Sequence, residues 1–86
     1  MRELERDAFL AWLRELGGKP CGSALLCPIA TYLGLIGKFS NINAKILAQD
    51  TAWGRAFIRW ADKEDRVHQW NLISGDDAAD YLESLP

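Results

Sequence analysis

The sequence predicts a compact, mainly α domain of four helices, and three observations support this fold class. Four segments carry apolar residues at the i, i+3, i+4, i+7 spacing of one helical face, separated by glycines, prolines or capping residues. The hydrophobic fraction of 49% beside 26% charged residues is typical of a folded chain. A chain of 86 residues has room for one core, so we expect a single domain over residues 1–86.

The first apolar stripe predicts a helix over residues 3–16. It consists of Phe9, Trp12, Leu13 and Leu16. Most charged side chains of this segment lie off the stripe, and Gly17-Gly18 supply a C-terminal stop. The following residues, 18–26, contain Lys19-Pro20-Cys21-Gly22 and are typical of a loop.

A second helix is expected to begin at Pro28. Proline loses no hydrogen bond at the first helical position, because the N–H there has no partner inside the helix. Pro28 is therefore the first residue of the helix and Cys27 occupies the cap position. Gly37 ends an apolar stripe that consists of Ile29, Tyr32, Leu33 and Ile36.

The segment from Phe39 to Leu47 shows a different pattern. Ile42, Ala44 and Ile46 alternate with Asn and Lys, and this period of two predicts a short strand. Residues 67–73 also carry alternate apolar residues, so they could pair with residues 42–47 as one short two-stranded antiparallel ribbon. Such a ribbon is stable only where helices cover it, and the sequence leaves its formation open.

Two further helices are expected over residues 52–65 and 75–85. Asp50 or Thr51 can cap the first of them, and Ser74 with Asp77 approximates a capping box for the second. The stripe of the first helix consists of Trp53, Ala56, Phe57, Trp60 and Ala61. The stripe of the second consists of Ala78, Tyr81, Leu82 and Leu85.

Charge is unevenly distributed along the chain. The formal net charge of −2 and pI of about 5.2 argue against a general binder of polyanions. Residues 38–66 carry six basic and four acidic side chains, whereas residues 74–86 carry four acidic side chains and no basic one. A basic middle segment and an acidic C-terminal helix are therefore expected.

The sequence favours a cytoplasmic protein. Charged and apolar residues alternate from Arg2 to Glu15, unlike the unbroken apolar run of a signal peptide. The longest weakly charged stretch, Cys21 to Gly37, is interrupted by Pro and Gly and falls short of the ~20 apolar residues of a membrane span. Two cysteines without an export signal indicate free thiols in a reducing compartment, and we expect no membrane contact.

Cys27 has two interpretations. A cysteine at a helix N-terminus can ionise easily, and a thiol-based enzyme or redox sensor would use it in this form. Free cysteine is also among the most buried residue types, and the sequence favours a buried, capping side chain. His68 is the only histidine, and the spacing of Cys21 and Cys27 matches no zinc signature. We therefore expect no metal, no cofactor and no catalytic set.

Three surface features are candidates for binding a partner. Arg55, Arg59 and Lys63 stand at i, i+4 and i+8, so they form one basic face of the helix over residues 52–65. Trp70 lies outside the predicted helices, where it is either buried or an exposed anchor for a partner. The acidic candidates, on the last helix, are Asp76, Asp77 and Asp80.

The segments FLAWL, CPIATYL and WGRAFIRW occur in an order that resembles small uncharacterised proteins of bacteria and phages. Those proteins share a Cys-Pro-Leu/Ile-Ala-x-Tyr-Leu stretch. The resemblance implies a shared fold and brings no activity with it.

The absence of a catalytic set and the separated basic and acidic faces lead to the first hypothesis, a small non-enzymatic protein that binds another protein. An inhibitor of a host defence complex, of the anti-CRISPR or anti-restriction type, would suit such a scaffold. The alternatives are a thiol-based enzyme using Cys27 and a helical domain that binds nucleic acid through residues 52–65.

Overall fold

The computed structural model describes residues 2–86, and its helices confirm the mainly α fold. Four of the five α-helices have nine residues or more, and a single turn of 3-10 helix, η1, precedes the last one. The elements are α1 (Arg6–Leu16), α2 (Pro28–Leu33), α3 (Ser40–Ala48), α4 (Ala52–Val67), η1 (Trp70–Leu72) and α5 (Gly75–Ser84).

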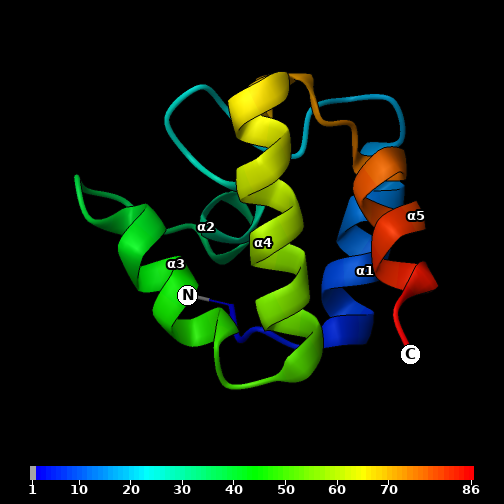
Figure 1. The fold of residues 1–86 in the computed structure, drawn as a ribbon, viewed down its shortest axis with the longest axis horizontal. Helices are drawn as coiled ribbons and strands as arrows, with labels where there is room; N and C mark the ends of the chain where they lie inside the picture. The colour runs from blue at the N-terminus through cyan, green and yellow to red at the C-terminus, as the bar shows by residue number, and fades with distance from the viewer. Residues whose placement is uncertain (1) are drawn as a thin grey trace.

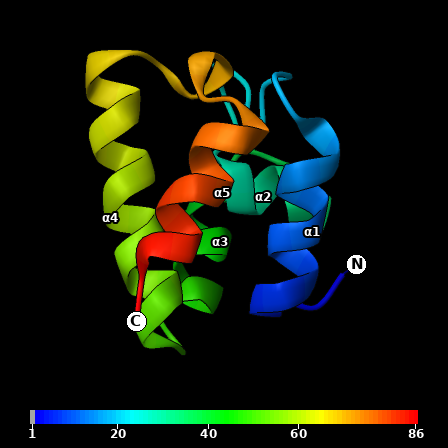
Figure 2. The same ribbon diagram turned by 90° about the vertical axis from the view of Figure 1, so that its right-hand side faces the viewer.

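The helices form two pairs on either side of the molecule. Helix α1 packs against α5, and α3 packs against both α2 and α4. Figure 1 shows α4 near the centre, with α3 on one side and the α1–α5 pair on the other. In Figure 2 the α1–α5 pair faces the viewer, with α2 behind it. The resulting domain measures 28 × 25 × 22 Å.

The helix ends differ from the predicted ones where local hydrogen bonds decide them. Helix α1 begins at Arg6 rather than at residue 3, because the Glu5 carboxylate accepts hydrogen bonds from the N–H groups of Asp7 and Ala8. Helix α2 ends before Gly34, which adopts a left-handed conformation at φ 71°, so the predicted extension towards Gly37 is wrong.

The short strand predicted over residues 42–47 is a helix instead, and the ribbon does not form. Ala44 and Ala48 follow Ser40 at four-residue intervals on the buried side of α3, a helical spacing that the alternating isoleucines conceal. Residues 67–73 contain the end of α4, a turn and η1. Within residues 2–86 the β pairing is limited to one antiparallel bridge between Pro20 and Ser74.

Aromatic rings fill the centre of the core around Phe9, which has no exposed surface. Four ring centroids lie 5.0–6.1 Å from that of Phe9, from α1, α2 and α4. They belong to Trp12, Tyr32, Trp53 and Phe57. Clustered rings of this kind bury a large apolar area for a small domain, which is the main contribution to its folding.

Both helix pairs approach closely at a glycine. A Cβ atom added at Gly75 would overlap the carbonyl oxygen of Leu13 in α1. A Cβ atom added at Gly54 would overlap the carbonyl oxygen of Ala48 in α3. The absence of a side chain at these positions is therefore what allows each pair its short separation.

Candidate partner-binding surface

Helix α3 is inverted, since it buries small side chains and exposes large ones. Ser40, Ala44 and Ala48 face the neighbouring helices with at most 2% of their surface exposed. On the opposite side, three large apolar residues, two of the helix and the cap residue directly before it, are 55–59% exposed. We call these the α3 ridge, and they are Phe39, Ile42 and Ile46.

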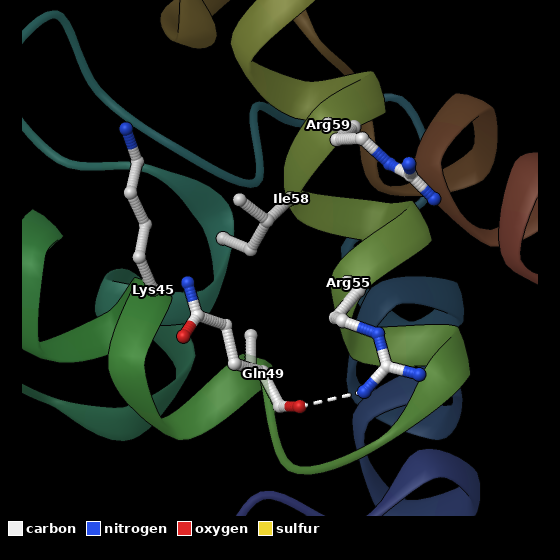
Figure 3. A pocket seen from close by; sticks show the side chains of 6 residues that line it. Lys45, Gln49, Arg55, Ile58 and Arg59 are labelled. Atoms are coloured by element: carbon white, nitrogen blue, oxygen red, sulfur yellow. Dashed lines mark hydrogen bonds between the residues drawn. The ribbon is translucent and has the colours of Figure 1, made fainter.

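A groove lies between α3 and α4 and has a volume of about 360 Å³. Figure 3 shows Ile58 pointing from α4 into the space between the helices, with Lys45 and Gln49 rising from α3. We call this the α3–α4 groove, and its lining residues are Lys45, Ala48, Gln49, Arg55, Ile58 and Arg59. Apolar atoms form its floor, and each charged residue that lines it is a cation.

The structure brings two of the three predicted basic residues to this groove. Arg55 and Arg59 are exposed on α4, and Lys63 follows one turn further along the same helix. The Arg55 guanidinium donates a hydrogen bond of 2.8 Å to the carbonyl oxygen of Gln49, which fixes it at the groove (Figure 3). Lys45, which the sequence did not indicate, forms an ion pair of 2.9 Å with Asp62.

Arg59 differs from these neighbours because it makes no hydrogen bond or ion pair with any of residues 2–86. The residue lines the partly apolar groove and is exposed, and in Figure 3 its guanidinium extends across α4 on the side away from α3. It is the cation of the groove that is best able to bind a carboxylate of another molecule.

The acidic candidates lie on the other helix pair. Arg14 of α1 forms ion pairs with Asp76 at 3.3 Å, Asp80 at 2.8 Å and Glu83 at 2.9 Å. These hydrogen bonds, the one to Asp80 foremost, raise the pKa of the Arg14 guanidinium. Ser74 caps the start of α5, where its hydroxyl accepts a hydrogen bond of 3.0 Å from the backbone N–H of Asp77. Three of the four carboxylates of α5 thus contact one cation of α1.

Trp70 is part of the core rather than an exposed anchor. Its side chain is 8% exposed, and its indole N–H donates a 3.1 Å hydrogen bond to the carbonyl oxygen of Ala61. Its backbone N–H donates to the Asp65 carboxylate at 3.2 Å. The expectation that Trp70 offers a contact to a partner is therefore corrected.

Both thiols are buried and favour the protonated form. Cys27 has no exposed surface, and its sulfur accepts the Ala30 N–H at 3.4 Å as the cap of α2. Burial raises the pKa of Cys27 and raises that of Cys21 to about 12. The only histidine, His68, is exposed. The described residues contain no cluster of His, Cys, Asp and Glu that could hold a metal ion.

The residues that sequence reasoning missed are those of the α3 ridge and Lys45. The signal that could have found them is the series Ser40, Ala44, Ala48, which marks the inward side of a helix and so assigns the isoleucines to the outside. That series was hidden by the alternation of apolar and polar residues over the same segment.

Comparisons of the chain with protein-family models, with characterised proteins and with solved structures found no match. Among residues 2–86, no helix combines the length and the apolar character that crossing a membrane requires.

Proposed function

We propose that this protein is a small non-enzymatic binding protein that docks another protein on the surface formed by the α3 ridge and the α3–α4 groove. The observation that carries the proposal is the inversion of α3. Three large apolar side chains, two on one short helix and one directly before it, are exposed to solvent although smaller ones are buried.

Such a surface is unusual for a folded domain of this size. Single exposed apolar residues are common, but a contiguous apolar patch with a polar rim is typical of an interaction site. Ile36, three residues before Phe39, is a further large apolar residue that is 95% exposed. Ile42 and Ile46 neighbour the groove residues Lys45 and Gln49, respectively, at the helical spacing of three.

The function in the cell that we propose is inhibition, carried out in the cytoplasm by covering a surface of a larger host complex. An inhibitor of anti-CRISPR or anti-restriction type, from a phage or mobile element, is the specific form of this proposal. It is supported by the small size of the domain and by the resemblance of its Cys-Pro-containing stretch to bacterial and phage proteins. The two alternatives draw less support, because Cys27 is buried and because the basic residues border an apolar surface.

Loss of the α3 ridge tests the proposal. The variant Phe39→Ser/Ile42→Ser/Ile46→Ser should keep the helical circular dichroism of the wild type, because these side chains contribute little to the core. The wild-type protein and the variant are each immobilised and exposed to a lysate of the host cells. The wild type should retain a partner protein from the lysate, and the variant should not.

A matched control replaces two other exposed apolar residues, in Val67→Ser/Leu72→Ser, which are 65% and 66% exposed. This control should capture the same protein as the wild type. Capture that persists in the ridge variant would contradict the proposal. So would binding of DNA whose affinity falls steeply with salt concentration, since that result indicates a phosphate-binding surface.

A further inference from the structure

The α3–α4 groove combines an apolar floor with a rim of one charge sign. Ala48 and Ile58 supply the floor, and Lys45, Arg55 and Arg59 are the charged residues that line it. Asp62 balances Lys45, but the arginines lie beside the groove without a carboxylate partner among residues 2–86. An element that fits both features has an apolar face and a neighbouring row of carboxylates.

A helix is the element whose shape fits this surface. The α3 ridge follows the i, i+3, i+7 spacing and extends about 10 Å along the α3 axis, like the anchor residues of helices that pair side by side. Addition of a strand has no support, because the described residues contain no sheet whose edge could receive one. The groove beside the ridge, in turn, can accept a side chain that projects from such a helix.

A second copy of this chain is a poor occupant of the same surface. A twofold contact between two α3 ridges would place the same cations beside the ridge in both copies, so Arg55 and Arg59 would meet no row of carboxylates there. The acidic helix α5 is no better as a partner. Its carboxylates are largely held by Arg14, and none of its large apolar residues is exposed.

We propose that the occupant is an amphipathic helix of a partner protein, with apolar residues on the α3 ridge and carboxylates directed to Arg55 and Arg59. This inference rests on the function proposed above and specifies the chemistry of the partner. The affinity of the complex should then depend on negative charge in the partner helix as well as on its apolar residues.

Designed peptides of about 18 residues, which form helices about 27 Å long, provide a direct test. The first has a leucine stripe flanked by glutamates, the second replaces each glutamate by lysine, and the third keeps the glutamates and replaces each leucine by glutamine. Each is titrated into the ¹⁵N-labelled full chain and followed by the amide shifts. The first peptide should bind, with shifts confined to α3 and α4, and the other two should bind at least about tenfold more weakly.

A charge reversal at the rim sharpens the test. Arg59→Glu should weaken binding of the glutamate peptide by about tenfold or more, because it places a like charge where the carboxylates lie. Lys19→Glu makes the same change of charge at an exposed residue of the loop after α1, and it should leave the affinity unchanged. Equal binding of the glutamate and lysine peptides, or equal affinity in both variants, would overturn the inference.

Two other occupants are outcomes of the same experiment. Tighter binding to vesicles containing phosphatidylglycerol than to the glutamate peptide would indicate a membrane surface and overturn the inference. Amide shifts of the α3 ridge that depend on protein concentration alone would indicate self-association and do the same. If the peptides fail while the ridge variant still loses its captured protein, the partner chemistry is wrong and the proposed binding surface stands.

Discussion

The pairs α1–α5 and α3–α4 are built alike on the inside and differ on the outside. In each pair a glycine of one helix approaches a backbone carbonyl of the other, at Gly75 in the first and Gly54 in the second. The α1–α5 pair directs its large apolar residues inward, including Phe9, Leu13 and Leu82, none of which has exposed surface. The α3–α4 pair instead presents the α3 ridge to solvent.

The charged residues of the two pairs also differ in whether they have partners within the molecule. In the α1–α5 pair, the cation Arg14 holds three carboxylates of the neighbouring helix. In the α3–α4 pair, Arg59 lies at the groove rim without an ion pair among the described residues. In this sense the α1–α5 pair is completed within the molecule, whereas the α3–α4 pair exposes to solvent large apolar side chains and a cation without an ion pair among the described residues. The difference separates residues that stabilise the fold from residues available for binding.

The largest expected change in stability comes from replacing one phenylalanine by alanine in each helix pair. Phe9→Ala removes a fully buried ring from the centre of the core and should lower the free energy of unfolding by about 3–5 kcal/mol. Phe39→Ala removes a ring that is 56% exposed and should change it by less than about 0.5 kcal/mol. Urea unfolding followed by circular dichroism measures both values. Similar losses in the two variants would mean that Phe39 packs into the core.

A smaller loss of stability is expected at the glycines through which the two helices of each pair approach closely. Gly54→Ala and Gly75→Ala should each lower the free energy of unfolding by about 1–3 kcal/mol, because the new methyl group overlaps a carbonyl oxygen of the facing helix. Alanine also has a higher helix propensity than glycine, which favours the folded state by about 1 kcal/mol. This gain is smaller than the cost expected from the overlap.

Gly18→Ala is the matched control for these glycines, since a Cβ atom there has no neighbour within 4 Å. Its thermal denaturation midpoint should stay close to that of the wild type. If Gly54→Ala unfolds at the same temperature as this control, then α3 and α4 are not in close contact and the groove between them has a different shape.

The sequence predicted the α1–α5 pair and helix α4 well, and helix α3 poorly. Helices α1, α4 and α5 follow apolar stripes that face the core, so pattern and burial agree. In α3 the large apolar residues are outside, so the pattern that normally marks the buried side pointed to a strand. The basic residues Arg55 and Arg59 could be found because their spacing places them on one face. The groove could not, since it depends on the packing of α3.

The smallest expected change in stability concerns one arginine of each pair. Arg14→Gln and Arg59→Gln each remove one positive charge from an exposed helix position. Arg14→Gln should lower the melting temperature slightly, by less than either glycine replacement, because it releases three carboxylates of α5 that then repel one another. This decrease in melting temperature should become smaller in about 1 M salt, where the screening length is ~3 Å.

Arg59→Gln should leave the melting temperature unchanged at both salt concentrations, since no ion pair with a described residue is lost. Equal salt-dependent losses in the two variants would show that Arg59 is also bound within the fold, and the α3–α4 pair would then be as complete as its counterpart.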